Sequence, residues 1–249
     1  MNAVILAGAL NSGSLRTVST ARYEAEIEIA GRPMLDYVIS ALQQVSAIDR
    51  IVVVGSAQMV SGEIAGPKLI PVESGLTMID SLLKGINALD SLEPVLVATS
   101  DIPLITREAV EDFLRRCQQI AGDIYYSFVP KETNEAKYPG VQRTYVTLKD
   151  GTFTGGNLAL IAPSVIRDNQ AMLRRAAELR KKPVQLCKML GWRYLLKLIV
   201  GRLTIGEIEQ RINSAFKIQA VGVVSPYPEV GIDVDKPSDF RLATKVLSK

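Results

Sequence analysis

The stretch MNAVILAGALNSGSLR (residues 1–16) opens the chain with a short apolar run that ends at a glycine. Val4 to Leu6 has the composition of a buried strand, and Gly8 is followed by small and polar residues. A glycine directly after a strand permits either a tight turn or the close approach of a ligand to the backbone. The loop has neither the GxGxxG spacing of a dinucleotide-binding fold nor the spacing of a P-loop. The stretch therefore predicts a strand and a turn, with both roles of the turn open.

Strand and helix patterns alternate through the rest of the first half. The expected helices are residues 32–45, 77–89 and 106–120, and the expected strands are residues 50–56, 68–72 and 94–101. Thr106 is the expected N-cap of the third helix. Buried strands that alternate with helices predict an α/β fold with a mainly parallel, Rossmann-like sheet covered on both faces. Ligands of such sheets bind beyond the carboxyl ends of the strands, where the Gly8 loop and the Ser100-Asp101 turn both belong.

The amino-acid composition limits the classes of protein and of catalytic site to which this chain can belong. The chain has 249 residues, 47% of them hydrophobic, and a net charge of +3. It has no apolar run long enough to span a membrane and no signal-peptide pattern, so we expect a cytoplasmic protein. Cys117 and Cys187 lie in no metal-binding or redox spacing and are expected to be reduced. The sequence contains no histidine, which excludes Ser-His and Cys-His catalysis and the usual zinc sites.

Carboxylates are therefore the leading candidates for chemistry. Asp101 ends an apolar strand, and Asp233 and Asp235 lie in a late segment that could return beside it. Mg²⁺ is commonly held by one or two carboxylates together with substrate phosphates. Asp101, Asp233 and Asp235 are the candidate ligands, and Asp239 is expected to be structural. The alternative is that Asp101 caps the following helix and that the later aspartates form caps or turns.

Four motifs occur in a recognisable order: LAGA (residues 6–9), IAGRPMLDYVISAL (29–42), ATSDIPLIT (98–106) and GIDVDKPSDF (231–240). In this order the chain resembles the MobA-like NTP transferases, which are nucleotidyltransferases related to the molybdenum-cofactor guanylyltransferase and have a GT-A-like fold. The resemblance extends over nearly the whole chain. It implies one nucleotidyltransferase domain, residues 1–249, with a basic helical insertion at about 164–214.

The resemblance implies an enzyme that transfers a nucleotidyl group from an NTP to a small phosphorylated acceptor, with Mg²⁺ as cofactor and release of pyrophosphate. CTP and GTP are the favoured nucleotides. The resemblance favours Asp101 and Asp233 as the metal ligands, with Asp235 as the competing second ligand, and Asp101 would also be catalytic. The implied nucleotide-binding residues are Leu6, Ala7, Gly8, Ala9, Gly75, Ser81 and Ser100. Gly85 would be a packing position in the helix beside the nucleotide.

One residue departs from the family's pattern. Glu24 stands where the family usually has a lysine that neutralises triphosphate charge, and a carboxylate there would repel that substrate. Arg16 or Arg22 could supply the catalytic cation instead, because a guanidinium binds phosphate oxygens through a planar fork. Two other functions stay open: a catalytically impaired nucleotide-binding regulator, and a GT-A glycosyltransferase whose metal motif is Asp233-Val234-Asp235.

Residues 137–163 alternate apolar and polar side chains around a Lys-Asp-Gly turn, which predicts a hairpin-like excursion from the sheet. The resemblance implies that this region forms part of the acceptor site, with Gly155, Gly156 and Asn157 as binding residues. A bulge with a structural asparagine is the alternative. Lys131, Lys137 and Arg143 are candidates for an anionic acceptor, although each is more simply a solvated side chain.

Residues 167–202 contain ten Lys or Arg against Asp168 and Glu178, a net charge of +8. Pro183 is expected to divide the segment into two helices. Basic residues mixed with Trp192 and several leucines suit weak contact with an anionic membrane, or a subdomain that packs its apolar face on the core. The apolar positions spread widely, which favours packing. No basic patch interleaved with aromatic residues indicates nucleic-acid binding.

Overall fold

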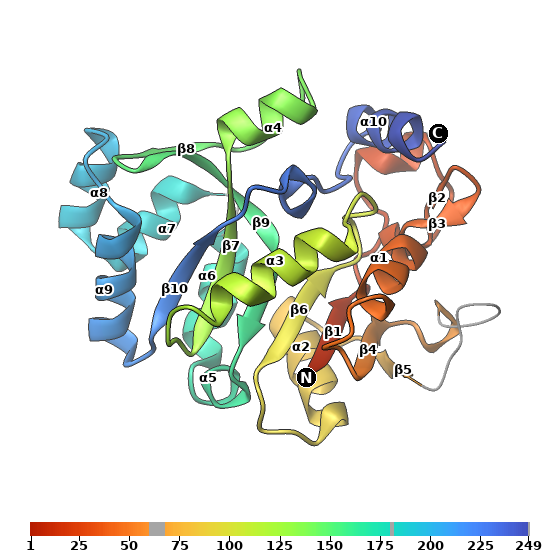
Figure 1. Ribbon diagram of the computed structural model, residues 1–249, viewed down its shortest axis with the longest axis horizontal. Helices are drawn as coiled ribbons and strands as arrows, with labels where there is room; N and C mark the ends of the chain where they lie inside the picture. The colour runs from red at the N-terminus through yellow and green to blue at the C-terminus, as the bar shows by residue number, and fades with distance from the viewer. Residues whose placement is uncertain (60–67, 180–181, 249) are drawn as a thin grey trace.

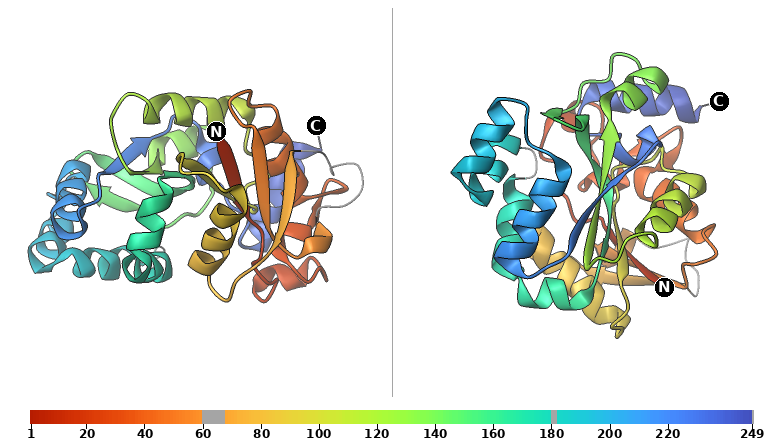
Figure 2. Two further views of the ribbon diagram at one scale, coloured as in Figure 1. Left: turned by 90° about the horizontal axis from the view of Figure 1, so that it is seen from below. Right: turned by 60° about the vertical axis from the view of Figure 1, so that its left-hand side comes forward.

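The computed structural model describes residues 1–59, 68–179 and 182–248. In this part of the chain a central sheet of eight strands is flanked by helices on both faces, and a two-stranded ribbon lies apart from it (Figures 1 and 2). Most neighbouring strands are parallel. The expected α/β fold with a mainly parallel, Rossmann-like sheet is confirmed.

The sheet has the strand order β10-β7-β9-β6-β1-β4-β5, with β8 paired to β9 beside this path. Strands β5, β4, β1 and β6 run parallel, whereas β9 is antiparallel to both β6 and β7. The bounds of the central strands are β1 (Asn2–Leu6), β4 (Arg50–Gly55), β5 (Leu69–Glu73), β6 (Val95–Thr99), β7 (Ile124–Pro130), β8 (Val146–Leu148), β9 (Gly151–Ile161) and β10 (Ala220–Val224). The ribbon pairs β2 (Glu28–Ile29) with β3 (Arg32–Pro33).

Helices connect most of these strands. Their bounds are α1 (Met34–Gln43), α2 (Met78–Leu89), α3 (Arg107–Cys117), α4 (Lys131–Lys137), α5 (Pro163–Asp168), α6 (Gln170–Leu179), α7 (Pro183–Leu190), α8 (Trp192–Ile199), α9 (Ile205–Phe216) and α10 (Pro237–Leu247). Short 3-10 turns lie at η1 (Ser14–Thr17), η2 (Glu24–Glu26), η3 (Ala57–Met59) and η5 (Pro228–Gly231). Pro183 begins α7, as expected, but the expectation of only two helices in the basic segment is wrong: Gly191, at a φ of 128°, ends α7 and separates it from α8, and α6 precedes both.

The two faces of the sheet bury separate apolar clusters, because successive strand residues point to opposite faces. Ala3 and Ile5 pack with residues of α1 and α3 on one face. Val4 packs with residues of α2, α5 and α6 on the other. The right-hand view of Figure 2 shows α3 on one side of the sheet and the cyan to mid-blue helices α7, α8 and α9 on the opposite side.

Hydroxyl and carboxylate side chains fix the starts of several helices. The Thr106 hydroxyl accepts a hydrogen bond from the Ala109 amide at 3.2 Å, as predicted for the N-cap of α3. Thr77 accepts from the Asp80 amide at 3.1 Å at the start of α2. Because Thr106 caps α3, the alternative in which Asp101 caps that helix is wrong.

The hairpin of residues 137–163 differs in one respect from the expectation. β8 and β9 form an antiparallel hairpin around Lys149-Asp150, as predicted. The far end of β9, however, inserts into the middle of the sheet between β6 and β7 and is not an excursion from it. Its residues Leu158, Leu160 and Ile161 are buried, so the removal of their apolar area from water stabilises the insertion.

Both cysteines are free and buried, as the sequence predicts. Burial raises the pKa of the Cys117 thiol to about 12 and also raises the pKa of Cys187. Neither thiol is therefore a nucleophile near neutral pH. Among the described residues, no helix is long and apolar enough to cross a membrane.

A substitution at Gly85 tests how tightly α2 packs on the sheet. A Cβ atom there would lie 2.8 Å from methyl carbons of both Val4 and Val54. We expect Gly85→Ala to destabilise the protein by about 1–3 kcal/mol through overpacking, although alanine favours a helix. Gly206→Ala in α9 is the control, because a Cβ there meets nothing within 4 Å. Urea unfolding of the two variants should give ΔΔG values of opposite sign, and equal values would contradict this packing.

Candidate active site

The carboxyl ends of β1, β6 and β5 lie at one edge of the sheet and carry the loops that the sequence singled out. Leu6 and Thr99 are register partners, and the Ser100 amide donates to the Leu6 carbonyl at 3.2 Å. A Cβ on Gly8 would lie 2.7 Å from the Ser74 Cβ, so the loops after β1 and β5 are also in contact. The Gly8 loop and the Ser100-Asp101 turn therefore share one edge, as predicted.

Three aspartates meet at this edge. One carboxylate oxygen each of Asp101, Asp233 and Asp235 lies within 4.8 Å of the others. The Val234 amide donates to the Asp101 carbonyl at 2.8 Å, which fastens the late segment beside the end of β6. The Thr99 hydroxyl donates to the Asp101 carboxylate. The structure thus brings Asp101 and Asp233 together, and it places Asp235 in the same cluster.

Arg143 is the buried counter-ion of this cluster. Only 6% of its side chain is exposed, and its Nη1 lies 3.0 Å from an Asp233 carboxylate oxygen and 3.3 Å from one of Asp239. Its Nη2 also donates to the Asp233 main-chain carbonyl at 2.6 Å. The expectation of a solvated Arg143 is therefore wrong. Asp239 has the expected structural role, because it pairs with Arg143 and accepts from the Asp235 amide at 3.3 Å.

The loop that leaves β1 folds back over the same edge. The Asn11 amide group donates to the carbonyls of Ser19 and Ala21 at 3.1 and 3.0 Å, which holds residues 11–21 together. The Ser14 hydroxyl donates to the Asp235 carbonyl at 3.3 Å. The turn η1, which includes Arg16, is therefore attached to the aspartate cluster.

Glu24, Arg16 and Arg22 occupy different parts of this loop. The Glu24 amide donates to the Ala9 carbonyl at 2.9 Å, which places Glu24 directly beside the opening turn. The exposed Arg16 lines an open depression of about 640 Å³ with residues 17–21, Glu26 and Glu28. The exposed Arg22 lies over the Tyr23 ring, 5.3 Å from its centroid.

The predicted nucleotide-binding residues differ in whether their backbone amides and carbonyls already make hydrogen bonds within the fold. The Ala7 amide donates to the Val54 carbonyl at 2.7 Å, so it is already used within the fold. The Leu6 carbonyl accepts from Ser100, whose side chain is buried. Gly8 and Ala9 follow the last residue of β1 and begin the loop at the sheet edge.

A second open depression of about 640 Å³ lies beside the loop after β5 and is lined by Gly75, Leu76, Asp80 and Lys84 among others. The Ser81 hydroxyl accepts from the Gly75 amide at 2.9 Å, so it holds the loop in place. A Cβ on Gly75 would lie 2.4 Å from the Asp80 Cβ, which explains the glycine. Hydrogen bonds from the Arg174 guanidinium and from the hydroxyl and amide of Thr77 hold the pKa of Asp80 well below its usual range.

Gly155, Gly156 and Asn157 lie in β9, on the strand that enters the sheet beside β7. A Cβ on Gly156 would lie 2.2 Å from the Ser127 hydroxyl oxygen, and the Asn157 amide group donates to the Val230 carbonyl at 3.2 Å. Both residues therefore have structural partners. Their assignment to the acceptor stays a prediction.

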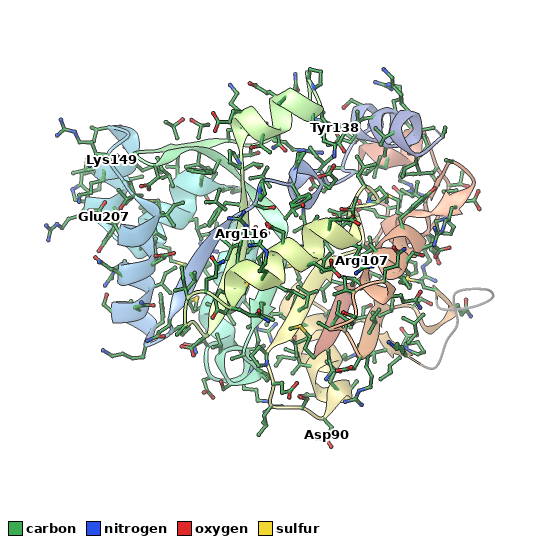
Figure 3. The ribbon with its side chains drawn as sticks, viewed as in Figure 1. Asp90, Arg107, Arg116, Tyr138, Lys149 and Glu207 are labelled. Atoms are coloured by element: carbon green, nitrogen blue, oxygen red, sulfur yellow. The ribbon has the colours of Figure 1, made fainter. Side chains whose placement is uncertain are left out.

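Sequence reasoning missed a buried carboxylate near this region. Glu229 in η5 is only 2% exposed, pairs with Lys137 and accepts from the Tyr138 hydroxyl at 2.9 Å. Burial and the neighbouring Glu229 raise the pKa of Tyr138. Figure 3 shows Tyr138 between α4 and α10. Lys137 is therefore ion-paired and not simply solvated.

Comparison with known proteins agrees with this arrangement. The family model of the MobA-like NTP transferase domain matches residues 3–185. The chain belongs to the MobA-like NTP transferase family. It is therefore a nucleotidyltransferase, and the expected family and enzyme class are confirmed.

Solved structures share the fold of this MobA-like transferase. A hypothetical transferase from Thermus thermophilus is 36% identical, with 96% of this chain and 100% of that chain covered and a TM-score of 0.81. A 4-diphosphocytidyl-2C-methyl-D-erythritol synthase from Anaerococcus prevotii is 14% identical, with 100% and 96% covered and a TM-score of 0.60. A CMP:2-keto-3-deoxy-manno-octonic acid synthetase in complex with CTP is 17% identical, with 100% and 99% covered and a TM-score of 0.62. No curated protein sequence matches the chain significantly.

Arg143 gives a direct test of the charge balance at the site of this transferase. Replacing it with methionine leaves Asp233 and Asp239, both buried, without the guanidinium that contacts them. We expect Arg143→Met to lower the free energy of unfolding by about 3–5 kcal/mol. The control is Arg107→Met, which removes an exposed pair with Glu111 and should cost under about 1 kcal/mol. Similar losses in the two variants, measured by urea unfolding, would show that Arg143 is no internal counter-ion.

Proposed function

We propose that this nucleotidyltransferase transfers a nucleotidyl group from CTP or GTP to a small phosphorylated acceptor and releases pyrophosphate. The observation that carries the proposal is the aspartate cluster of Asp101, Asp233 and Asp235 at the same sheet edge as the Gly8 loop. The fold shared with a synthetase in complex with CTP supports CTP as the first nucleotide to test.

The cluster suits Mg²⁺. Its donors are carboxylate oxygens, which this hard cation prefers, and they converge from two segments far apart in sequence. We assign Asp101 and Asp233 as ligands, with Asp235 as the competing one. Bound there, Mg²⁺ would neutralise triphosphate charge and polarise the α-phosphate.

The protein's own residues would position the two substrates. In this proposal the backbone of Leu6 to Ala9 contacts the base and phosphates, with Gly75, Ser81 and Ser100 forming the neighbouring wall. Ser81 acts through the loop that it holds, since its hydroxyl accepts from the Gly75 amide. Gly155, Gly156 and Asn157 are assigned to the acceptor side, where β9 passes beside β7.

The transfer itself needs no histidine. A phosphate oxygen of the acceptor attacks the α-phosphorus, forming a new P–O bond as the bond to the bridging oxygen of the β-phosphate breaks. Pyrophosphate leaves with that electron pair. An acceptor phosphate is largely ionised at neutral pH, so no base has to remove a proton. Catalysis then rests on positioning and on charge neutralisation, which agrees with a sequence that has no histidine.

The triphosphate still requires a cation to replace the lysine that the family usually has. Glu24 lies beside the Ala9 carbonyl, so its carboxylate would disfavour a bare triphosphate nearby. We assign the compensating charge to Arg16 or Arg22. Arg16 belongs to η1, the turn that Ser14 fastens to the Asp235 carbonyl, and Arg22 lies two residues before Glu24.

The metal assignment is tested by Asp101→Asn. This change keeps the shape of the side chain and removes its charge. We therefore expect the rate of pyrophosphate release with CTP or GTP to fall by about 10²-fold or more. The melting temperature should change little. Asp90→Asn is the matched control, since Asp90 lies at the far end of the molecule from the site (Figure 3) and has the left-handed conformation that asparagine tolerates. An Asp101→Asn enzyme with full activity would refute the assignment.

The arginines are tested by nucleotide binding. If Arg16 or Arg22 holds the triphosphate, its replacement by alanine should weaken NTP binding by roughly 1.5–3 kcal/mol, as expected for a lost charge-assisted hydrogen bond. Glu24→Lys should then change affinity little. Calorimetry with CTP and Mg²⁺ measures both. A large gain of activity in Glu24→Lys would instead favour the alternative of an impaired nucleotide-binding protein.

A further inference from the structure

Helix α8 presents an apolar stripe to solvent. Trp192, Leu196, Ile199 and Val200 are 68%, 44%, 68% and 62% exposed. Residues four, seven and eight positions apart lie on one side of a helix, so these side chains form a continuous stripe. Val184 in α7, 55% exposed, has the same character. Figure 1 shows α8 at the outer left end of the molecule.

The stripe is not the face that holds α8 on the protein. Leu195 is buried, and Tyr194 and Leu198 pack against the cluster of Leu148, Phe153, Cys187 and Leu203. Tyr194 and Leu198 lie on the side of the helix opposite Trp192 and Leu196, since successive residues of an α-helix advance by 100°, and the buried Leu195 lies at the edge between the two sides. The helix therefore has one apolar side for the fold and a second apolar side that the fold leaves exposed.

The charged side chains of the segment that carries the stripe all have one sign. From Lys182 to Arg202 the sequence contains five basic residues and no Asp or Glu. Arg193 and Lys197 follow Trp192 and Leu196 by one position each and border the stripe on one side. Lys188 and Arg202 are exposed at its two ends. Among the described ion pairs, Glu207 of α9 contacts Lys197 and so neutralises one of these charges.

We infer that α8 is a membrane-contact surface that docks on anionic lipid. A tryptophan and branched apolar residues bordered by lysine and arginine match the boundary between acyl chains and negatively charged headgroups. Hydrophobic burial and electrostatic attraction would act on the same helix face, and neither alone gives stable anchoring. The inference is independent of the proposed reaction, because none of the residues assigned to the active site belongs to this surface.

Trp192 makes the test direct, because it is the only tryptophan of the chain. The full protein is mixed with vesicles of phosphatidylcholine alone or with about one-third phosphatidylserine, and flotation and Trp192 emission are measured. We expect binding and a blue shift only with the anionic vesicles. Raising salt from about 100 to about 500 mM should reduce the bound fraction several-fold, because salt screens the basic residues.

Two variants test whether vesicle binding depends on the stripe of α8 and not on exposed apolar residues elsewhere. Leu196→Ser with Ile199→Ser should reduce vesicle binding by about ten-fold or more without changing the melting temperature, because both side chains are exposed. Leu92→Ser is the control: Leu92 is 83% exposed but lies in the loop after α2, and its replacement should leave binding intact.

Three outcomes would overturn the inference: no flotation with anionic vesicles, equal flotation with neutral ones, or equal loss in the Leu92 control. A fourth is a vesicle-free dimer, seen by sedimentation equilibrium, that the Leu196→Ser with Ile199→Ser variant dissociates. That result would assign the stripe to a second copy of the chain.

Discussion

The mutual repulsion of aspartates at one end of the sheet is the constraint on which the site depends. Oxygens of Asp101, Asp233 and Asp235 lie within 4.8 Å of one another, and two unit charges at that distance repel by about 3 kcal/mol at an effective dielectric of about 20. Arg143 offsets part of this charge by contacting Asp233 and Asp239. In the proposed function, a divalent cation bound together with a triphosphate completes the charge balance of this cluster. The same charges that destabilise the folded chain are those that would hold the metal.

This constraint explains why distant segments are tied together there. The end of β6 supplies Asp101, the segment before α10 supplies Asp233 and Asp235, and the coil before β8 supplies Arg143. Hydrogen bonds to main-chain carbonyls fix the arrangement, from the Val234 amide to Asp101 and from the Arg143 guanidinium to Asp233. The loop after β1 joins through Ser14 and Asp235. The fold can therefore keep several carboxylates close because hydrogen bonds to main-chain carbonyls and the Arg143 ion pairs hold the segments together.

The first half of the fold could be predicted because its signals are local. Apolar runs such as Val52 to Val54, the cap at Thr106, and Asp101 after a buried strand all lie within a few residues of the feature that they specify. Arg143 could not be placed, because it lies in a coil without periodicity and its partner Asp233 is 90 residues away. The insertion of β9 between β6 and β7 was equally hidden, since an alternating pattern indicates a strand but not its neighbours. Glu229 escaped notice because nothing near it in sequence signals burial.

Diffraction from crystals grown with Mn²⁺ and a non-hydrolysable CTP analogue tests the central claim most directly, because Mn²⁺ replaces Mg²⁺ and gives an anomalous signal. The account predicts one anomalous peak in contact with carboxylate oxygens of Asp101 and of Asp233 or Asp235. The triphosphate should lie between this peak and the Gly8 loop. A nucleotide bound at that loop with no metal at the aspartates, or a metal bound elsewhere on the chain, would contradict it.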